Sequence, residues 1–190
     1  MKISKSLIAI IAAVVIIGAW AASAYNSMVQ VQEKATTSLA NVQSAYQRRA
    51  DLIPNLVQTV KGYASHEKET LEGVVNARSK ATSITLNAEN IKEYQQAQGE
   101  LSSALGRLIA IGEAYPDLKA NENFRELQVQ LEGTENRINV ERNNFNKAVQ
   151  TYNVAIRKFP SNLLAGIFGF EKMDKFEAAA GSENAPKVEF

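Results

Sequence analysis

The chain has 190 residues, 45% of them hydrophobic, with 21 Lys plus Arg against 20 Asp plus Glu. This balance excludes the basic surface typical of nucleic-acid-binding proteins, and the absence of Cys excludes disulfides, thiol catalysis and Cys-ligated metals. Because Gly and Pro number only 10 and 4, a turn-rich all-β fold is also excluded, and an all-α fold is predicted.

The N-terminal segment has the composition of a membrane span. Residues 7–24 carry no charge and are almost entirely apolar, and about 20 such residues cross the hydrocarbon core of a bilayer as a helix. Trp20 and Tyr25 lie near the end of this apolar run, where amphipathic rings prefer the interface. We therefore expect residues 1–25 to be a single-pass anchor that contacts the lipid bilayer through residues 7–24.

The same segment also fits a cleaved secretory signal, because the small residues before Tyr25 match a cleavage site after Ala24. We favour retention, since the apolar run is longer than a usual signal core and continues into a helical segment. Lys2 and Lys5 precede the run, whereas only Lys34 follows it closely. The positive-inside rule then places the rest of the chain on the extracytoplasmic side of the membrane.

Residues 26–177 are predicted to form one helical body. Its apolar residues recur at steps of three and four, which marks the seams of long amphipathic helices that pack together. Helices over about 26–50, 52–80, 90–114 and 118–158, joined by short connections, predict an antiparallel up-and-down four-helix bundle. One column keeps a strict seven-residue spacing: Phe124, Leu131, Ile138, Phe145, Tyr152 and Phe159.

The first of these boundaries depends on Pro54. Asp51 could cap a new helix and place Pro54 in its first turn, where a missing N–H is harmless. The alternative is one long helix with a kink at Pro54, which leaves three long helices in place of four. We favour the break.

In the four-helix topology, the turns at 48–55 and 115–119 lie together at the end farthest from the membrane. This tip would combine arginines, carboxylates, an aromatic ring and proline-restricted backbone, which suits a polar docking surface for a protein partner. The alternative is that these charged turns are simply exposed to solvent and bind no partner, as is common for short charged turns. The candidate partner-binding residues are Arg48, Asp51, Asn55, Tyr115, Asp117 and Lys119.

A second group of candidates consists of polar residues on or beside the apolar seams. Such residues are expected to form partly buried ion pairs and hydrogen bonds that set the register of the helices. The alternative is that they line a polar pocket for a ligand. This buried polar seam consists of Arg49, Glu135, Glu141, Arg142 and Asn146.

The C-terminal segment 160–177 is amphipathic and too apolar for a loop. We expect it to pack on the bundle, on a partner or on lipid, with Phe168 and Phe170 as membrane- or bundle-docking side chains. The remaining residues, 178–190, are expected to be a disordered tail.

Motifs for catalysis are missing from the sequence. His66 is the single histidine, which excludes sites that need two imidazoles, and no phosphate-binding loop pattern occurs. We therefore expect no enzymatic activity, no metal and no cofactor.

Several long strings occur in order along the chain: YNSMVQ (25–30), QRRADLIPNLVQTVKGYASHE (47–67), EAYPDLKANENF (113–124), ENRINVERNNFN (135–146), YNVAIRKFP (152–160) and FGF (168–170). Together they closely resemble the LemA family of bacterial membrane proteins, from the anchor to about Phe176. The resemblance implies a bacterial cell membrane location, an N-terminal single-pass anchor and an antiparallel four-helix bundle. It supplies no defined activity, and some family descriptions place the bundle in the cytoplasm.

The residues and the resemblance together predict a membrane-anchored adaptor or scaffold of the bacterial envelope. Its protein partner is unidentified, and because some family members are connected with membrane proteases, such a protease is one candidate. The alternative functions are a regulatory partner of a membrane protease or envelope hydrolase, and a lipid-binding module that uses the C-terminal aromatic segment.

Overall fold

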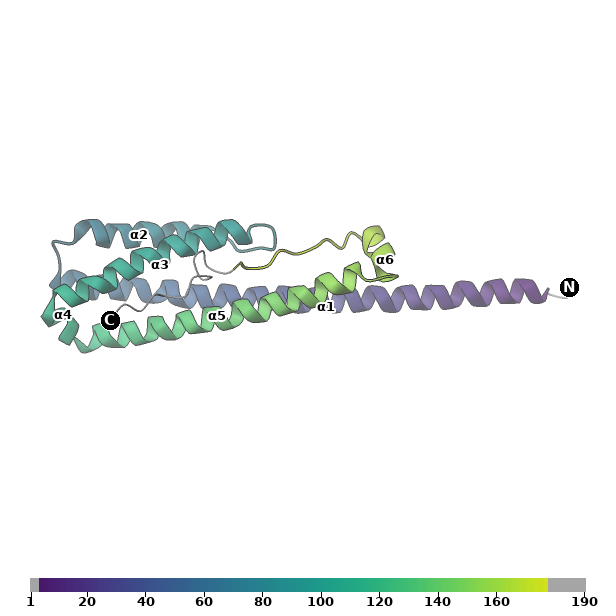
Figure 1. Ribbon diagram of the computed structural model, residues 1–190, viewed down its shortest axis with the longest axis horizontal. Coiled ribbons are helices and arrows are strands. Elements are labelled where there is room, and N and C mark those ends of the chain that lie inside the picture. The colour runs from purple at the N-terminus through teal and green to yellow at the C-terminus, as the bar shows by residue number, and fades with distance from the viewer. Residues whose placement is uncertain (1–3, 178–190) are drawn as a thin grey trace, which may run out of the picture.

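The computed structural model describes residues 4–177, and within that range all regular secondary structure is helical. This confirms the all-α prediction. The expected disordered tail, 178–190, lies outside the described residues. The elements are α1 (Lys5–Tyr63), α2 (Lys68–Ser83), α3 (Ile91–Ala114), α4 (Pro116–Ala120), α5 (Glu122–Arg157) and α6 (Ser161–Phe168) (Figure 1).

The most consequential element is α1, a single helix of 59 residues. It joins the expected anchor to the first predicted helix and continues through Pro54 to Tyr63. The predicted break at Asp51 is therefore wrong, as are the predicted helix bounds 26–50 and 52–80. The alternative of a helix that runs through Pro54 is closer to the structure.

A contact from α2 explains how α1 accommodates this proline. Pro54 has no N–H to donate to the carbonyl of Ala50, four residues earlier. Ala50 is buried, and an unpaired buried carbonyl is costly. The guanidinium Nε of Arg78, on α2, donates a hydrogen bond of 2.9 Å to the Ala50 carbonyl oxygen. The tertiary fold thus replaces the hydrogen bond that the helix lacks.

This arrangement predicts that Arg78 and Pro54 are energetically coupled. We expect Arg78→Ala to lower the free energy of unfolding by about 1–3 kcal/mol, because the Ala50 carbonyl loses its donor. In a Pro54→Ala background the loss should be smaller, since the new backbone N–H can donate instead. Urea unfolding of the four chains in a double-mutant cycle measures the coupling. Equal losses in both backgrounds would contradict it, and Arg107→Ala, at an exposed position on α3, is the control.

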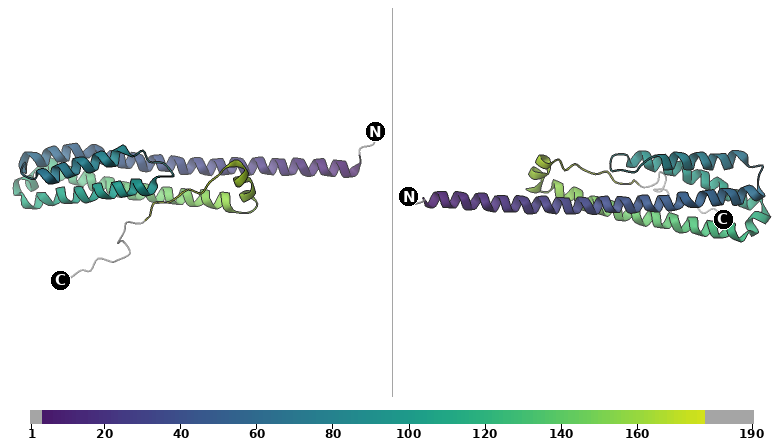
Figure 2. Two further views of the ribbon diagram at one scale, coloured as in Figure 1. Left: turned by 90° about the horizontal axis from the view of Figure 1, so that it is seen from above. Right: turned by 180° about the vertical axis from the view of Figure 1, so that it is seen from behind.

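The other helices surround only part of α1. Both views in Figure 2 show α5 running back along α1, while the α2–α3 hairpin covers the half of α1 farther from its N-terminus. The helices together form a long rod, and three groups of buried side chains follow one another along its axis. The distal core includes Ile53 and Leu108, the middle core includes Tyr46 and Phe145, and the proximal core is formed by Met28, Tyr152, Ile156 and Ala165.

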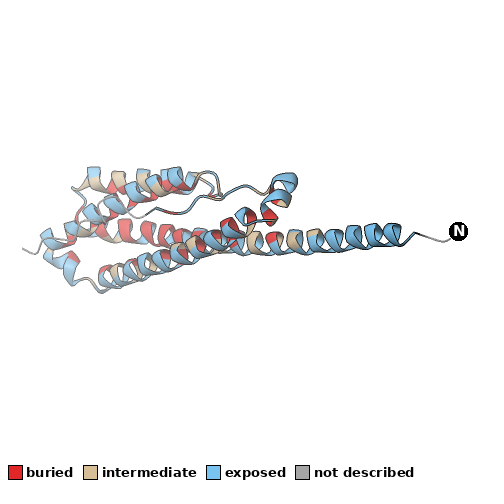
Figure 3. Ribbon diagram, turned by 45° about the vertical axis from the view of Figure 1, so that its right-hand side comes forward, coloured by how far each residue is buried: buried red, intermediate tan, exposed pale blue. Residues whose placement is uncertain are grey.

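The N-terminal part of α1 extends beyond the rest of the molecule. Figure 3 shows this part without any buried residue, whereas buried positions follow the inner faces of the body. By length and composition α1 can cross a membrane, and none of the residues in its most apolar 18-residue window is buried. An apolar helix that the protein does not cover is what a lipid-facing span requires.

Candidate functional site

The true distal tip is formed by the α1–α2 connection and the segment around α4. The hydroxyl of Tyr115 donates to Oε1 of Glu67 at 2.9 Å, and this hydrogen bond raises the pKa of Tyr115. Asn121 caps α5 by accepting from the N–H of Phe124 at 2.9 Å, while its amide donates to the hydroxyl of Tyr63 at 3.0 Å. The tip is therefore tied together by side chains from both connections.

The predicted partner-binding cluster does not assemble at this tip. Tyr115, Asp117 and Lys119 lie there, and Lys119 pairs with Glu113. Asp51, in contrast, lies 12 residues before the end of α1, which is about 18 Å of helix. It accepts a hydrogen bond of 2.7 Å from Gln47 on the same helix.

Arg48 and Asn55 are exposed on α1 near Asp51, so they do not reach the tip either. The prediction that these three residues lie beside Tyr115 is wrong, because it depended on a helix break at Asp51 and α1 continues to Tyr63.

A buried arginine connects three helices at the junction of the distal and middle cores. Arg49, on α1, is 3% exposed and donates from Nη1 to Oε2 of Glu135 at 2.7 Å. From the same nitrogen it donates to the hydroxyl of Ser102 at 2.9 Å, and from Nη2 to Oε1 of Gln98 at 2.6 Å. The two charges and two polar groups hold α1, α3 and α5 in one register, as predicted for Arg49 and Glu135.

Aromatic rings complete this junction. Arg49 lies over the ring of Tyr46, 5.2 Å from its centroid, and Tyr46 packs edge-to-face against Tyr94 at 5.2 Å. Burial raises the pKa of Tyr46, and burial together with Tyr46 raises the pKa of Tyr94 to about 12. Both phenols are therefore neutral at physiological pH.

The remaining seam residues differ in their burial and in their contacts. Glu141 is buried and pairs with Arg137 at 2.8 Å, one turn earlier on α5. Glu135 is half exposed. Arg142 and Asn146 are only partly buried, and they bind the C-terminal segment described below instead of forming ion pairs. Of the predicted seam residues, Arg49 and Glu141 are therefore buried, Arg142 and Asn146 are partly buried, and Glu135 is half exposed.

A groove runs between α3 and α5 beside Arg49. Its cavity has a volume of about 790 Å³ and its lining is mostly apolar. Leu105 and Ile109 contribute from α3, and Val129, which is 68% exposed, contributes from α5. The lining also includes the charged side chains of Arg125 and Glu132. Sequence reasoning did not identify this groove, because it depends on how far apart two helices lie.

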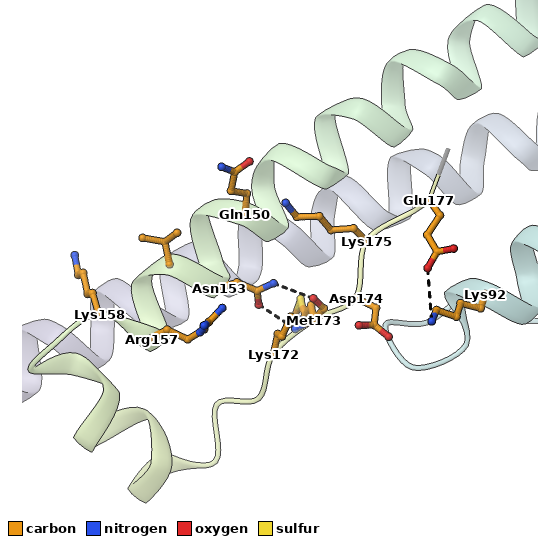
Figure 4. A pocket seen from close by; sticks show the side chains of 11 residues that line it. Lys92, Gln150, Asn153, Arg157, Lys158, Lys172, Met173, Asp174, Lys175 and Glu177 are labelled. Atoms are coloured by element: carbon orange, nitrogen blue, oxygen red, sulfur yellow. Dashed lines mark hydrogen bonds and ion pairs between the residues drawn. The ribbon is translucent and has the colours of Figure 1, made fainter. Parts of the chain in front are cut away.

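The segment Gly169–Glu177, here called the strap, returns along the helical body. Gly169 has φ of +72°, a left-handed conformation that ends α6 and is accessible to Gly at little cost. Side-chain amides of the helical body then hydrogen-bond the backbone N–H and C=O groups of the strap, as a neighbouring β-strand would. Asn153 donates to the carbonyl of Met173 at 2.9 Å and accepts from its N–H at 3.0 Å, as Figure 4 shows.

The same reciprocal pairing recurs along the strap. Asn146 exchanges two hydrogen bonds of 2.9 Å with the backbone of Phe176, and Gln95 exchanges two with Glu177. Asn146 and Asn153 are seven residues apart, about 10.5 Å along a helix. Met173 and Phe176 are three apart, about 10 Å along an extended chain. This match of the two spacings lets one face of α5 hold an extended segment.

The predicted docking residues Phe168 and Phe170 lie at the membrane-proximal end. Both pack edge-to-face against Tyr25, with ring centroids 4.9 Å and 5.7 Å away. Phe170 is partly buried against the proximal core, whereas Phe168 remains 52% exposed. The C-terminal segment therefore packs on the helical body, although not with all of its apolar surface.

Within residues 4–177, no cluster of three or more His, Asp or Glu side chains is arranged to hold a metal ion. At the Arg49 junction, Nη1 of Arg49 pairs with the carboxylate of Glu135.

Comparison with known proteins gives a consistent family. The chain is 29% identical over 180 residues to the magnetosome protein MamQ of Magnetospirillum gryphiswaldense, covering 83% of this chain and 66% of the relative. It is 25% identical over 154 residues to protein LemA of Metamycoplasma hominis, covering 81% and 67%. The chain thus spans about two thirds of the length of these curated relatives.

A sequence model described as the LemA family matches residues 38–190. The match covers most of the helical body, including the Arg49 junction, both sides of the groove and the strap. This chain belongs to the LemA family.

Proposed function

We propose that this protein is a membrane-anchored adaptor of the bacterial envelope that presents the α3–α5 groove to a protein partner. The observation that carries the proposal is the continuity of α1 from the apolar run to the groove. Between Ala24 and Arg49 the helix rises by about 38 Å. A helix that is packed along its length against α5 is a stiff spacer, so it would hold the groove at a set height above the bilayer.

The groove has the chemistry of a helix-binding surface. An amphipathic helix binds such grooves through apolar side chains one turn apart, while charges at the rim select its orientation. Leu105, Ile109 and Val129 supply the apolar lining, and Arg125 and Glu132 supply charges of both signs. A protein partner with an amphipathic helix, such as a subunit of a membrane protease, is the proposed occupant.

Family membership and the MamQ and LemA relatives support a membrane-associated helical protein. We further propose that the span is retained and that the helical body lies on the extracytoplasmic side. Lys2 and Lys5 before the apolar run, against Lys34 paired in sequence with Glu33 after it, support this orientation.

Site-specific photo-crosslinking in native membranes tests the adaptor proposal. A photoreactive residue in place of Arg125, at the groove, should give a discrete adduct with another protein. Val129→Glu should reduce its yield about tenfold or more, because an unpaired charge in an apolar interface costs at least ~1.4 kcal/mol. Val140→Glu, at another exposed valine of α5, should leave the yield unchanged.

A second probe in place of Asp117 distinguishes the groove from the distal tip. Adducts from position 117 alone would keep the adaptor function and move its binding surface to the tip that includes Tyr115 and Lys119. No adduct from either position would contradict the adaptor proposal.

A further inference from the structure

Helix α6 is held beside the end of the apolar run. Tyr25 directly follows residues 7–24, and its ring contacts both Phe168, the last residue of α6, and Phe170. The buried side of α6, with Ala165, packs in the proximal core against Met28 of α1. Any bilayer that holds residues 7–24 therefore has its surface next to α6.

The other side of α6 is apolar and uncovered. Leu163 and Ile167, one turn apart on α6, are 60% and 75% exposed, and Phe159, two residues before α6, is 81% exposed. Phe168 is also more than half exposed. Single exposed apolar residues are common on soluble surfaces, but a contiguous group on one short helix marks an interaction surface.

Positive charge accompanies this apolar face. Arg157 and Lys158 precede α6, and Lys172 and Lys175 follow it on the strap. All four line a cavity of about 770 Å³ between α5 and the strap (Figure 4). Among the described residues, none of these four cations lies within 4 Å of a carboxylate oxygen. Lys92 is different, because it pairs with Glu177.

We propose that α6 lies in the interfacial layer of the bilayer that holds α1, and that Arg157, Lys158 and Lys172, the cations nearest α6 along the chain, bind anionic phospholipid headgroups. An amphipathic helix lies in the interface with its apolar face toward the acyl chains, and basic side chains beside it are attracted to an anionic leaflet. The inference rests on the membrane anchor of the proposed function but not on the groove. Two attachments, the span and α6, would fix the tilt of the rod relative to the membrane.

The absence of Cys from the chain allows single fluorescent labels to test this. The full chain is reconstituted in nanodiscs of phosphatidylcholine with phosphatidylglycerol, carrying Ile167→Cys or Val129→Cys labelled with an environment-sensitive dye. Spin-labelled lipids should quench the dye at position 167 by about twofold or more, as for a group at the headgroup–acyl boundary. The dye at position 129, which is comparably exposed, should not be quenched.

Two further outcomes would overturn the inference. A blue-shifted dye at position 167 without quenching by lipid would mean that protein, such as a second copy, covers α6. A dye that is neither shifted nor quenched would mean that the face is solvated. Failure of the chain to enter nanodiscs at all would refute the anchor itself, whereas loss of groove crosslinks alone would leave the α6 result intact.

The role of the cations has its own test in the same nanodiscs. Lys158→Glu with Lys172→Glu should reduce quenching at position 167 when phosphatidylglycerol is present, and added salt should do the same in the unsubstituted chain. Lys61→Glu with Lys68→Glu, exposed positions near the distal tip, should have no effect. Equal quenching in all these chains would refute headgroup binding by these cations.

Discussion

Replacement of Arg49 by Ala is expected to lower the free energy of unfolding by about 2–4 kcal/mol, because it leaves a buried hydrogen-bond acceptor unpaired and removes a buried side chain. Arg49 is 3% exposed and binds three side chains on two other helices. Its removal leaves the buried carboxamide of Gln98 without its donor and empties space beside Tyr46. Urea unfolding of the full chain in detergent micelles, followed by circular dichroism, measures the loss.

The neighbouring residue provides a matched control for this prediction. Arg48 has the same side chain on the same helix but is exposed, so Arg48→Ala should change the stability by no more than about 0.5 kcal/mol. Glu135→Gln should have an intermediate effect, because Glu135 is half exposed and water can replace part of the interaction. Similar losses for Arg48→Ala and Arg49→Ala would show that the junction is not a stabilising centre.

Phe145→Ala should have an effect of similar size, about 3–5 kcal/mol, because it removes a fully buried ring from the middle core. Phe145 also packs edge-to-face against Phe176, with centroids 5.5 Å apart. The strap should therefore loosen as well, and trypsin should cleave after Lys172 and Lys175 faster than in the unsubstituted chain. Urea unfolding and timed proteolysis are the measurements.

The control for this prediction is Phe159→Ala, since Phe159 is 81% exposed although it continues the same seven-residue column. It should leave both the unfolding midpoint and the cleavage rate nearly unchanged. If Phe145→Ala destabilises the body without affecting cleavage, the strap is held by its hydrogen bonds and not by the contact between the two rings.

The periodic apolar columns allowed most of the helical body to be predicted. Phe124, Leu131, Ile138 and Phe145 are all buried as expected, because the burial of an apolar stripe depends chiefly on spacing along one helix. The end of α5 before Pro160 also agrees with the prediction. The same column fails at Phe159, since it lies beyond the end of α5, where α1 and α6 leave its ring uncovered.

The hydrogen bonds of the strap have a partial signal in the sequence. Asn153 follows Tyr152 as Asn146 follows Phe145, so a polar column lies directly beside the apolar one. The seam pattern predicts a structural role for Asn146 but not for Asn153 or Gln95. Their partners are backbone groups of an extended segment that lies 20 to 82 residues later in the chain, and backbone groups have no sequence signature.

The sequence by itself determined the helical class, the apolar run, the absence of recognisable catalytic motifs and the family, because each depends on residue types at fixed spacings along the chain. Only the tertiary structure decided that α1 continues through Pro54. The local rule predicts a break where an N–H is missing, but the deficit is met by Arg78, from 28 residues away. Because α1 is continuous, Asp51 lies away from the tip, and the position of the distal surface follows from the end of α1 at Tyr63.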